Sequence, residues 1–410
     1  VGYGTQQRKD LTGAVASVSS DDIGKLSFSD VGQAIQGKLS GVTIQQNTEP
    51  GGTADIRIRG LSTINNNNPL IVIDGIPSPN GLRDLNPNNI SSIDVLKDAS
   101  ATAIYGNRAS NGVIIVTTKK GKKGQKTKID FQAEYGVANV SRRIDVLNSE
   151  EYTMIMNESI ENAVEQELME DNINREMQLY DPQDTDWQDV IFRQGQQSDL
   201  NLSISGGSEQ TSFYLSGGYR DVKGVLIESD YTRYSFTSNI EHNLFDRITI
   251  GENLHLSYSD RADSYTHTSS GWSGVMQQAV TAAPQFPIYY DGQFAFGLAD
   301  DRPFYGDGNN PVWGAENGGT NHLTRVNGNA YIDVNILNGL DFKTSLGIDY
   351  SNNEYDNYTP PKVLARVPRE DIMENRFSKN QNWSWYNTLT YTNTFGKSNI
   401  TLLVGNSLER

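Results

Sequence analysis

The sequence has 410 residues and no cysteine, which excludes disulfide scaffolds, thiolate metal sites and cysteine nucleophiles. Its formal net charge of −16 is uneven, because residues 1–125 carry +3 and residues 126–410 carry −19. Such an acidic second part argues against nucleic acid as a partner. No stretch approaches the roughly 18 consecutive apolar residues of a transmembrane helix, which excludes a helical membrane protein but not a β-barrel.

Residues 1–125 are predicted to form a compact α+β domain. Apolar runs at 56–60 and 70–75 both end at glycine and indicate short buried strands. Further strands are expected at 90–97 and 111–118. Between them, 98–106 has an N-cap-like Asp98, helix-forming residues and a terminal glycine, so it predicts a short helix. The basic run 119–124 is interpreted as a linker.

From residue 126 onward the pattern changes to strands with one apolar face. Leu200, Leu202 and Ile204 alternate with Asn201, Ser203 and Ser205. The same period of two recurs at 213–219, 248–258, 326–336 and 340–350, and two more strands fit near 380–394 and 398–408. About nine strands are expected in all.

The connections between these strands alternate in length. Short connections are expected at 206–209, 243–247, 337–339 and 395–397. Long ones are expected at about 139–196, 261–322 and 355–378, with an intermediate one near 221–230. Outer-membrane barrels sort their loops in this way, with short periplasmic turns and long extracellular loops. Because the second face of each strand is polar, we expect a wide, wet lumen that the N-terminal domain plugs.

Several motifs resemble one known family. The run Arg57-Ile58-Arg59-Gly60, followed by the segment 69–77 (Pro-Leu-Ile-Val-Ile-Asp-Gly-Ile-Pro), is similar to the plug of TonB-dependent receptors. The segments 95–106 and 109–119 resemble the SusC/RagA version of that plug. Val1, Gly2, Tyr3 and Gly4 resemble the segment at or just after the TonB box. The resemblance implies a mixed α+β plug domain (1–125) followed by part of a transmembrane antiparallel β-barrel (126–410).

The resemblance also implies a function. SusC/RagA proteins import nutrients across the outer membrane of Gram-negative bacteria, driven by TonB with ExbB and ExbD, together with a SusD-like surface lipoprotein. We expect an oligosaccharide as the substrate, without a cofactor. An oligopeptide importer of the RagA type and a siderophore or cobalamin receptor are the alternatives within the class. A surface glycan-binding protein without transport and a secreted glycan hydrolase are the alternatives outside it.

The chain also departs from the family pattern. It does not begin with Met, and neither a signal peptide, the family's N-terminal extension domain nor most of the TonB box is found in it. Nine strands do not close a barrel of 22 strands. We therefore expect a processed or partial chain, whose wall is completed by further strands of the same protein or by another chain.

Three residues of the plug are candidates for gating. Arg57 and Arg59 alternate along one strand and are predicted to pair with acidic groups of the barrel wall, although ordinary plug surface is the simpler interpretation. Asp74 lies in the 69–77 motif and is assigned to the same group. Asn65, Asn66, Asn67 and Asn68 are candidates for substrate contact, since asparagine both donates and accepts hydrogen bonds. A turn that ends at Pro69 is the alternative.

The long loops supply the remaining candidates. Trp272, Tyr289, Tyr290 and Trp313 belong to an aromatic connection that is suited to stacking on sugars, to packing against the lipoprotein or to forming its own core. The acidic stretch 150–189 predicts a solvated helix that starts near Ser149 and has one buried apolar stripe of Tyr152, Ile155, Met156, Ile160, Val164 and Leu168; a docking or divalent-cation role is the alternative. The four histidines show no zinc-like spacing and no catalytic motif occurs, so no enzyme activity and no metal site are expected.

Overall fold

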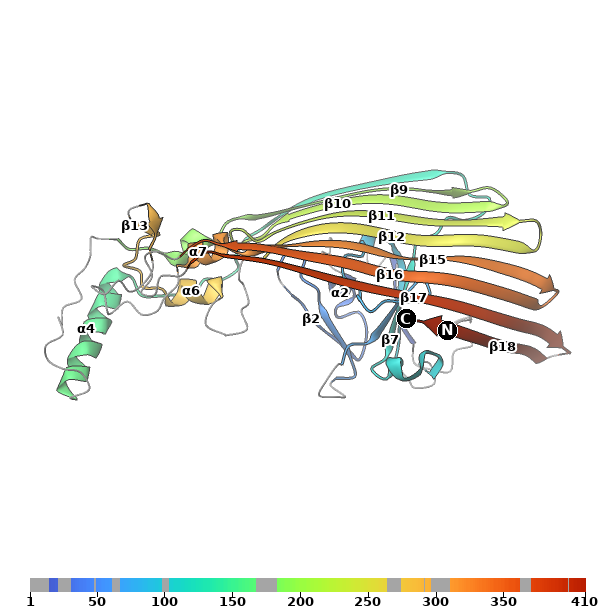
Figure 1. Ribbon diagram of the computed structural model, residues 1–410, viewed down its shortest axis with the longest axis horizontal. Coiled ribbons are helices and arrows are strands. Elements are labelled where there is room, and N and C mark those ends of the chain that lie inside the picture. The colour runs from blue at the N-terminus through green and yellow to red at the C-terminus, as the bar shows by residue number, and fades with distance from the viewer. Residues whose placement is uncertain are drawn as a thin grey trace.

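The structure is a computed structural model. It describes residues 15–20, 31–47, 49–60, 67–97, 103–166, 183–263, 274–290, 292–295, 310–361, 370–396 and 398–410. Two parts are evident in Figure 1: a small mixed domain, here called the plug, and a long twisted sheet, here called the wall.

The plug is built around a five-stranded sheet in the order β1-β6-β7-β4-β5. All of its neighbouring strands are antiparallel except β4 and β7, which run parallel. The strands are β1 (Val15–Ser19), β4 (Leu70–Ile73), β5 (Ile76–Pro77), β6 (Ile90–Leu96) and β7 (Val113–Thr118). The four runs that the sequence predicts as plug strands are all strands in the structure. The first corresponds to β3 (Asp55–Ile58), and the other three correspond to β4, β6 and β7.

Both faces of this sheet are covered. On one face, the helix α2 (Val31–Ile35) and the hairpin of β2 (Val42–Gln45) with β3 pack their apolar side chains against Ile73, Ile93 and Ile114. On the other face, Val72 and Leu96 contact Tyr105 and Ala109 of the 3-10 helix η3 (Ala103–Ala109). Burial on both faces explains why the strands are continuous apolar runs rather than alternating ones.

The wall is one antiparallel sheet in which strands that follow one another along the chain lie side by side. Its order, β8 to β12 and then β15 to β18, gives the nine strands that the sequence predicts. Their bounds are β8 (Lys128–Ala138), β9 (Gly195–Gly207), β10 (Thr211–Lys223), β11 (Asp230–Leu244), β12 (Ile248–Asp263), β15 (Gly319–Leu337), β16 (Leu340–Thr359), β17 (Ile372–Phe395) and β18 (Ser398–Glu409).

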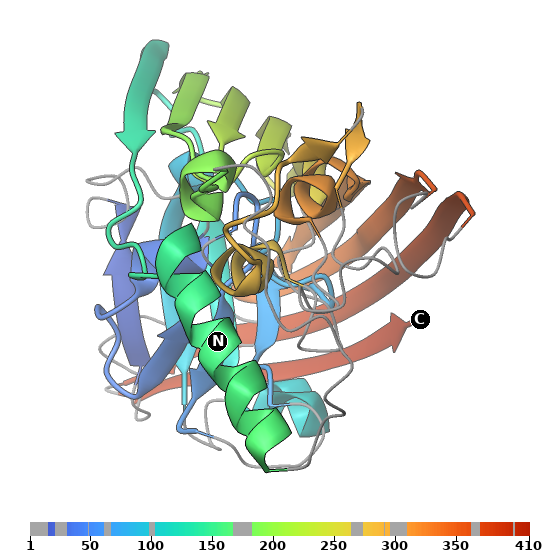
Figure 2. The ribbon, with the colours of Figure 1, turned by 90° about the vertical axis from the view of Figure 1, so that its left-hand side faces the viewer.

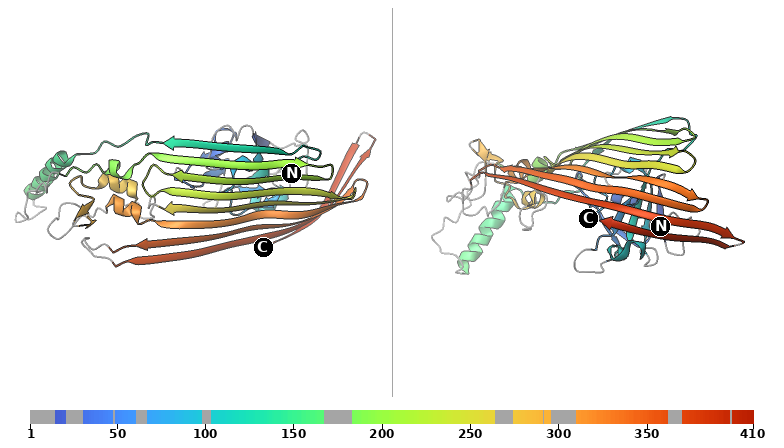
Figure 3. Two further views of the ribbon diagram at one scale, coloured as in Figure 1. Left: turned by 90° about the horizontal axis from the view of Figure 1, so that it is seen from above. Right: turned by 45° about the vertical axis from the view of Figure 1, so that its right-hand side comes forward.

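Loop length follows strand parity as predicted. The connections β9–β10, β11–β12, β15–β16 and β17–β18 have two or three residues each and lie at one end of the wall, on the right in Figure 1. The longer connections all lie at the other end, as the view from above confirms (Figure 3).

The long connections contain a layer of small helices, here called the loop layer. It holds α4 (Ser149–Glu165), α5 (Trp187–Ile191), α6 (Val275–Thr281), α7 (Pro311–Glu316) and the hairpin of β13 (Tyr289–Tyr290) with β14 (Gln293–Phe294). Trp187, Ile191, Leu226, Val275 and Phe286 come from three connections and share one apolar cluster. The loop layer therefore has a core of its own.

The predicted acidic helix is α4, and a capping box formed by Asn148 and Glu151 fixes its start. Its predicted apolar stripe is only partly buried. Ile160 is buried and Tyr152 and Met156 pack against the loop-layer core, but Ile155 is exposed. The prediction of burial for Ile155 was therefore wrong, because α4 contacts the layer along a narrow strip and leaves the rest of its surface to solvent. Leu168 lies outside the described residues.

The wall is strongly curved, and the plug lies on its concave side (Figure 2). Among the residues that the structure describes, no helix has the length and apolarity needed to cross a membrane.

Candidate functional site

Over strands β9 to β12, β15 and β16, the concave face of the wall is polar and largely buried, whereas the convex face is more apolar and more exposed. Along β9, Leu200 and Leu202 are 41% and 47% exposed, while Asn201 between them is 6% exposed. The neighbouring inward residues Asp199 and Ser203 are also buried. This is the reverse of a soluble sheet, and it matches the alternation of barrels that face lipid on the outside.

An irregular segment of the plug, residues 78–89, makes most of its hydrogen bonds to this polar face. Asn80 donates to Asp349 Oδ1 at 2.6 Å and accepts from Ser351 Oγ at 3.0 Å. Asn86 donates to Asn201 Oδ1 at 3.0 Å. Asparagine suits this position because one side chain offers both donors and acceptors.

The second half of the segment is held by a short helix, η2 (Pro87–Asn89). Asn86 caps it and Pro87 occupies its first turn, so the local sequence specifies it. The helix directs Asn89 at the wall, where its amide donates to Thr237 Oγ1 at 2.8 Å and accepts from the Tyr214 hydroxyl at 3.0 Å.

Three buried arginines of the wall stand at the same interface. Arg325 of β15, 3% exposed, donates to Ser78 Oγ at 2.6 Å, to the carbonyl of Gly81 at 2.9 Å and to the carbonyl of Arg83. Its guanidinium also lies 3.6 Å from Asp349 Oδ2.

The other two arginines are Arg233 and Arg220. Arg233 Nη1 donates to the carbonyl of Leu85 at 3.1 Å. Arg220 pairs at 2.8 Å with Asp199, a carboxylate that also accepts from Asn88 of the plug. Two of the three arginines, Arg325 and Arg233, thus donate from the wall to carbonyl oxygens of the plug.

Asp74 lies where the plug sheet meets the wall. It has φ 46° and begins the tight Asp74-Gly75 turn between β4 and β5. Its carboxylate accepts hydrogen bonds from Thr118 N at 3.0 Å, Thr118 Oγ1 at 2.7 Å and His255 Nε2 at 3.0 Å. Burial alone would raise the pKa of the Asp74 carboxyl, but the bonds from His255 and Thr118 hold that pKa below its ordinary value.

A chain of hydrogen bonds connects Asp74 to η2 through the wall. His255 Nδ1 lies 3.2 Å from Thr237 Oγ1, which in turn accepts from Asn89. Asn239 of β11 adds a second contact beside Asp74, because it donates to Thr118 Oγ1 at 2.9 Å and to the Lys119 carbonyl at 2.7 Å. Asp74, one of the three gating candidates, therefore takes part in hydrogen bonds that join plug and wall.

The other gating candidates lie on the β2–β3 hairpin. Arg57 is half-buried on β3, and Arg59 follows the strand in an exposed turn with φ 59°. Their predicted pairing with acidic wall residues stays a prediction.

Two of the four candidate asparagines are described. Asn67 is half-buried and Asn68 is exposed, while Asn65 and Asn66 lie outside the described residues. Asn68 borders a cavity of about 630 Å³ on the plug, together with Asn80, Arg108 and Asn111.

The remaining candidates are spread over the loop layer and the N-terminus. Tyr289 and Tyr290 are half exposed on β13, where the Tyr289 ring lies 4.8 Å from that of Phe294. Trp313 is buried in α7. Trp272 and the segment Val1, Gly2, Tyr3 and Gly4 lie outside the described residues.

Sequence reasoning missed most of this interface. It did not single out Asn80, Asn86, Asn89, His255 or Arg325. One signal was present, since a charged residue at an inward strand position, such as Arg325, needs a partner inside the barrel. The partner itself lies more than 240 residues away in the chain, so no local pattern identifies it.

A plug held by hydrogen bonds on the polar side of a curved antiparallel wall defines the class of TonB-dependent receptors. A family model described as "TonB-dependent Receptor Plug Domain" matches residues 7–113. TonB-dependent receptor P3 of Formosa agariphila is 33% identical over 418 residues, covering 100% of this chain and 39% of that protein. TonB-dependent receptor SusC of Bacteroides thetaiotaomicron is 36% identical over 299 residues, covering 70% of this chain and 28% of that protein.

Solved structures agree. The RagAB peptide importer in its open-open state superimposes with a TM-score of 0.80 at 26% identity, covering 99% of this chain and 48% of that chain. The ferric citrate transporter FecA has a TM-score of 0.59 at 12% identity, covering 98% and 47%, and shows the fold alone. The chain belongs to the SusC/RagA group of TonB-dependent receptors. It spans well under two thirds of these relatives, whose names denote receptors and transporters rather than enzymes.

Proposed function

We propose that the protein to which this chain belongs imports a nutrient across the outer membrane of a Gram-negative bacterium, driven by TonB with ExbB and ExbD. The observation that carries the proposal is the plug seated by hydrogen bonds on the polar face of a wall whose other face is apolar. An apolar convex face suits lipid. Hydrogen bonds between plug and wall can be exchanged for bonds to water, so the interface can open without exposing a large apolar surface.

In this proposal the plug is the moving part. TonB engages the N-terminal segment that contains Val1, Gly2, Tyr3 and Gly4 and thereby displaces plug from wall. Asp74 holds the plug through His255, and Arg57 and Arg59 are assigned to the same gating role.

The proposed substrate is an oligosaccharide. The cavity beside Asn68 is bordered by six amide or hydroxyl side chains and by a larger number of apolar residues, and its charged members are Asp55 and Arg108. Amides and hydroxyls match the donors and acceptors of a neutral sugar. Asn65, Asn66 and Asn67 belong to the same run and are proposed to contribute to this contact.

The loop layer is the proposed docking site of a SusD-like surface lipoprotein. Tyr289 and Tyr290 are half exposed there, and Met154 and Ile155 of α4 present apolar surface. Trp272 and Trp313 belong to the same connection and complete the aromatic set that is proposed to serve the partner or the substrate.

An oligopeptide substrate is the second candidate. It is favoured by the similarity to the RagAB peptide importer, which extends over nearly the whole of this chain. A peptide brings charged termini, and Asp55 and Arg108 are available in the same cavity to pair with them.

The deciding experiment is native mass spectrometry of the complete protein purified from outer membranes in mild detergent. We expect a companion lipoprotein and a retained ligand whose mass fits a series of hexose or related sugar units. A ligand mass that fits amino-acid residues would replace the oligosaccharide by a peptide. A lone protein that stays in solution without detergent would contradict the transport proposal as a whole.

A double substitution tests the cavity. Asn68→Ala with Asn111→Ala removes two amides from its border and is expected to lower retention of the ligand, while the yield of folded protein in the membrane is unchanged. Asn399→Ala, at the exposed start of β18 and away from the cavity, is the control. If the double variant and the control retain the ligand equally, the cavity beside Asn68 does not contribute to ligand binding.

A further inference from the structure

A second cavity lies between the plug and strands β17 and β18 of the wall. Its volume is about 320 Å³, and its lining includes Arg108 of the plug and Glu409 of β18. Pro77, Pro79 and Arg108 border this cavity and also the cavity beside Asn68, so the two cavities meet at these three residues. The plug surface that they form is here called the β18 flank. Ligand pockets have volumes of about 300–1,000 Å³, so the second cavity is large enough to admit part of a ligand.

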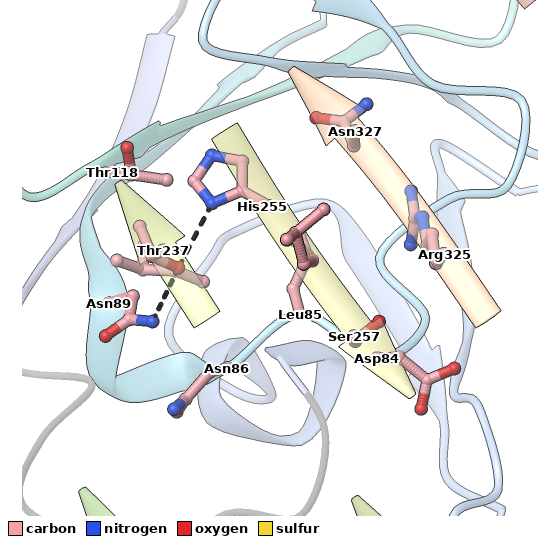
Figure 4. A pocket seen from close by; sticks show the side chains of 12 residues that line it. Asp84, Leu85, Asn86, Asn89, Thr118, Thr237, His255, Ser257, Arg325 and Asn327 are labelled. Atoms are coloured by element: carbon pink, nitrogen blue, oxygen red, sulfur yellow. Dashed lines mark hydrogen bonds between the residues drawn. The ribbon is translucent and has the colours of Figure 1, made fainter. Parts of the chain in front are cut away.

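Six other strands of the wall hold the plug through buried hydrogen bonds. Figure 4 shows one region of this contact, in which Asn89 of the plug, Thr237 of β11 and His255 of β12 are connected in series. Breaking such bonds is costly, because it leaves buried donors and acceptors without partners. The six strands contribute one wall partner each, all between 1% and 7% exposed: Asn201, Tyr214, Thr237, His255, Arg325 and Asp349.

The β18 flank is joined to the wall in a different way. Arg108 forms an ion pair with Glu409, in which Nη2 donates to Oε1 at 3.1 Å and Nη1 donates to Oε2. The two side chains are 50% and 23% exposed, so water can solvate both charges as they separate. Exposed ion pairs contribute less than buried polar contacts for this reason. Parting this ion pair therefore costs less than parting the six buried contacts.

The wall side of the second cavity offers polar groups to a ligand. Ser384 is 6% exposed, and its Oγ has no hydrogen-bond partner within the described part of the chain. Ser384 lies opposite Glu409 in the sheet, and Asn382 lies two residues away on the same face. A hydroxyl, an amide and a charged pair can all exchange hydrogen bonds with the hydroxyl groups of a sugar chain.

We propose that TonB parts the plug from the wall first along the β18 flank, and that the ligand leaves the cavity beside Asn68 through the second cavity. Separation of Arg108 from Glu409 opens this route, while the buried bonds to β9–β12, β15 and β16 keep the plug seated. Passage of the ligand then does not require the whole plug to leave the wall. The inference rests on the proposed import function and deepens it by assigning the route.

Thiol labelling in cells tests the route without knowledge of the ligand, because the chain has no cysteine of its own. Ser384→Cys places a thiol in the second cavity, and Ser257→Cys places one on β12 beside Asp84 and Leu85 of the plug (Figure 4). The two serines are matched in burial, at 6% and 9% exposed. The probe is a membrane-impermeant maleimide, added to cells that make the complete protein and are grown as for native mass spectrometry. Labelling rates are compared with and without an uncoupler that collapses the proton gradient, and wild type gives the background.

We expect Ser384→Cys to react about tenfold faster in energised cells, and Ser257→Cys to react slowly with or without the uncoupler. Equal acceleration at both positions would show that the whole plug leaves the wall and would overturn the proposal. Acceleration at Ser257 alone, or at neither position, would overturn it as well. Native mass spectrometry decides the import function separately, so these outcomes reject the route and leave the proposed function in place.

A charge variant tests the ion pair as the gate. Glu409→Gln weakens the attraction to Arg108, so the thiol of Ser384→Cys should react several times faster in this background even when the proton gradient is collapsed. Glu374→Gln is the matched control, since Glu374 also forms an exposed ion pair, with Arg376 of the same strand. Equal labelling rates in the two backgrounds would show that the Arg108–Glu409 pair does not hold the β18 flank closed.

Discussion

Asp74 joins three parts of the chain. Its backbone closes the β4–β5 turn, while its carboxylate accepts hydrogen bonds from the end of β7 and from β12 of the wall. Hydrogen bonds to a charged group contribute about 1.5–3 kcal/mol each, and a buried donor left without a partner costs about 1–3 kcal/mol. A single side chain can therefore account for a substantial part of the attachment of plug to wall.

Replacing Asp74 by Asn should weaken the attachment of the plug to the wall. It should also make the stability of the folded protein less dependent on pH. Because the pKa of Asp74 is lowered in the folded state, its stabilisation is fully present above the ordinary aspartate pKa of about 3.9 and is lost as the pH falls through the lowered value. We expect the variant to unfold at a lower temperature than wild type at pH 7, and the gap to narrow below about pH 4.

Thermal unfolding of the complete protein in detergent, followed from pH 7 to pH 3, measures this. Asp246→Asn in the exposed β11–β12 turn is the control and should follow wild type throughout. A gap between Asp74→Asn and wild type that is independent of pH would show that the charge of Asp74 does not contribute.

The paired substitution Arg57→Ala with Arg59→Ala tests the other gating residues. If they hold the plug during transport, ligand binding should be nearly intact while uptake falls, since neither residue borders the cavity beside Asn68. Binding is measured on the purified protein and uptake in cells that carry the variant. Equal losses of binding and uptake would contradict a gating role.

At the scale of elements, the plug segment 78–89 and the wall strands differ in how far sequence specifies them. The wall strands follow from an alternation that each strand shows by itself. The segment is irregular, and its position depends on close approach to the wall. A Cβ at Gly218 of β10 would lie 2.5 Å from Asn86 Nδ2, so an alanine at that position would displace the Asn86 side chain from its bond to Asn201.

Two neighbouring glutamates on opposite faces of the wall test its orientation. Glu252 lies on the convex face between Ile250 and Leu254, bonded to Ser238 at 2.5 Å, whereas Glu241 lies on the concave face and pairs with Lys123 at 2.9 Å. If the convex face contacts lipid, Glu252→Leu should stabilise the barrel by about 1 kcal/mol, and Glu241→Leu should destabilise it.

Urea unfolding of the complete protein in phospholipid vesicles measures both changes. Destabilisation by Glu252→Leu would mean that this part of the convex face is covered by protein rather than by lipid.

At the scale of the whole molecule, the structure divides into plug, wall and loop layer, each with its own packing. The loop layer has an apolar core to which three separate connections contribute. Trp187 is central to it, because its indole Nε1 donates to the Ala283 carbonyl at 3.0 Å while its ring is buried. The layer is therefore expected to keep its shape as a unit when plug and wall separate.

Replacing Trp187 by Ala should lower the free energy of unfolding of the loop layer by about 3–5 kcal/mol and leave the wall folded. Limited proteolysis should then cut the long connections faster, while the migration of the unheated barrel on a gel stays as in wild type. Faster cleavage within the wall turns as well would show that the layer and the wall unfold together.

The sequence by itself determined the alternating strands, their number, the sorting of loop lengths and the group of receptors to which the chain belongs. These features depend on local periodicity and on contiguous motifs, and both are carried by residues that are close together in the sequence. Only the tertiary structure decided that Arg325, His255 and Asn89 meet at one interface, that Asp74 is hydrogen-bonded to the wall, and that Ile155 is exposed. Those outcomes depend on which surfaces the curved wall brings together across hundreds of residues, and local periodicity carries no information about such contacts.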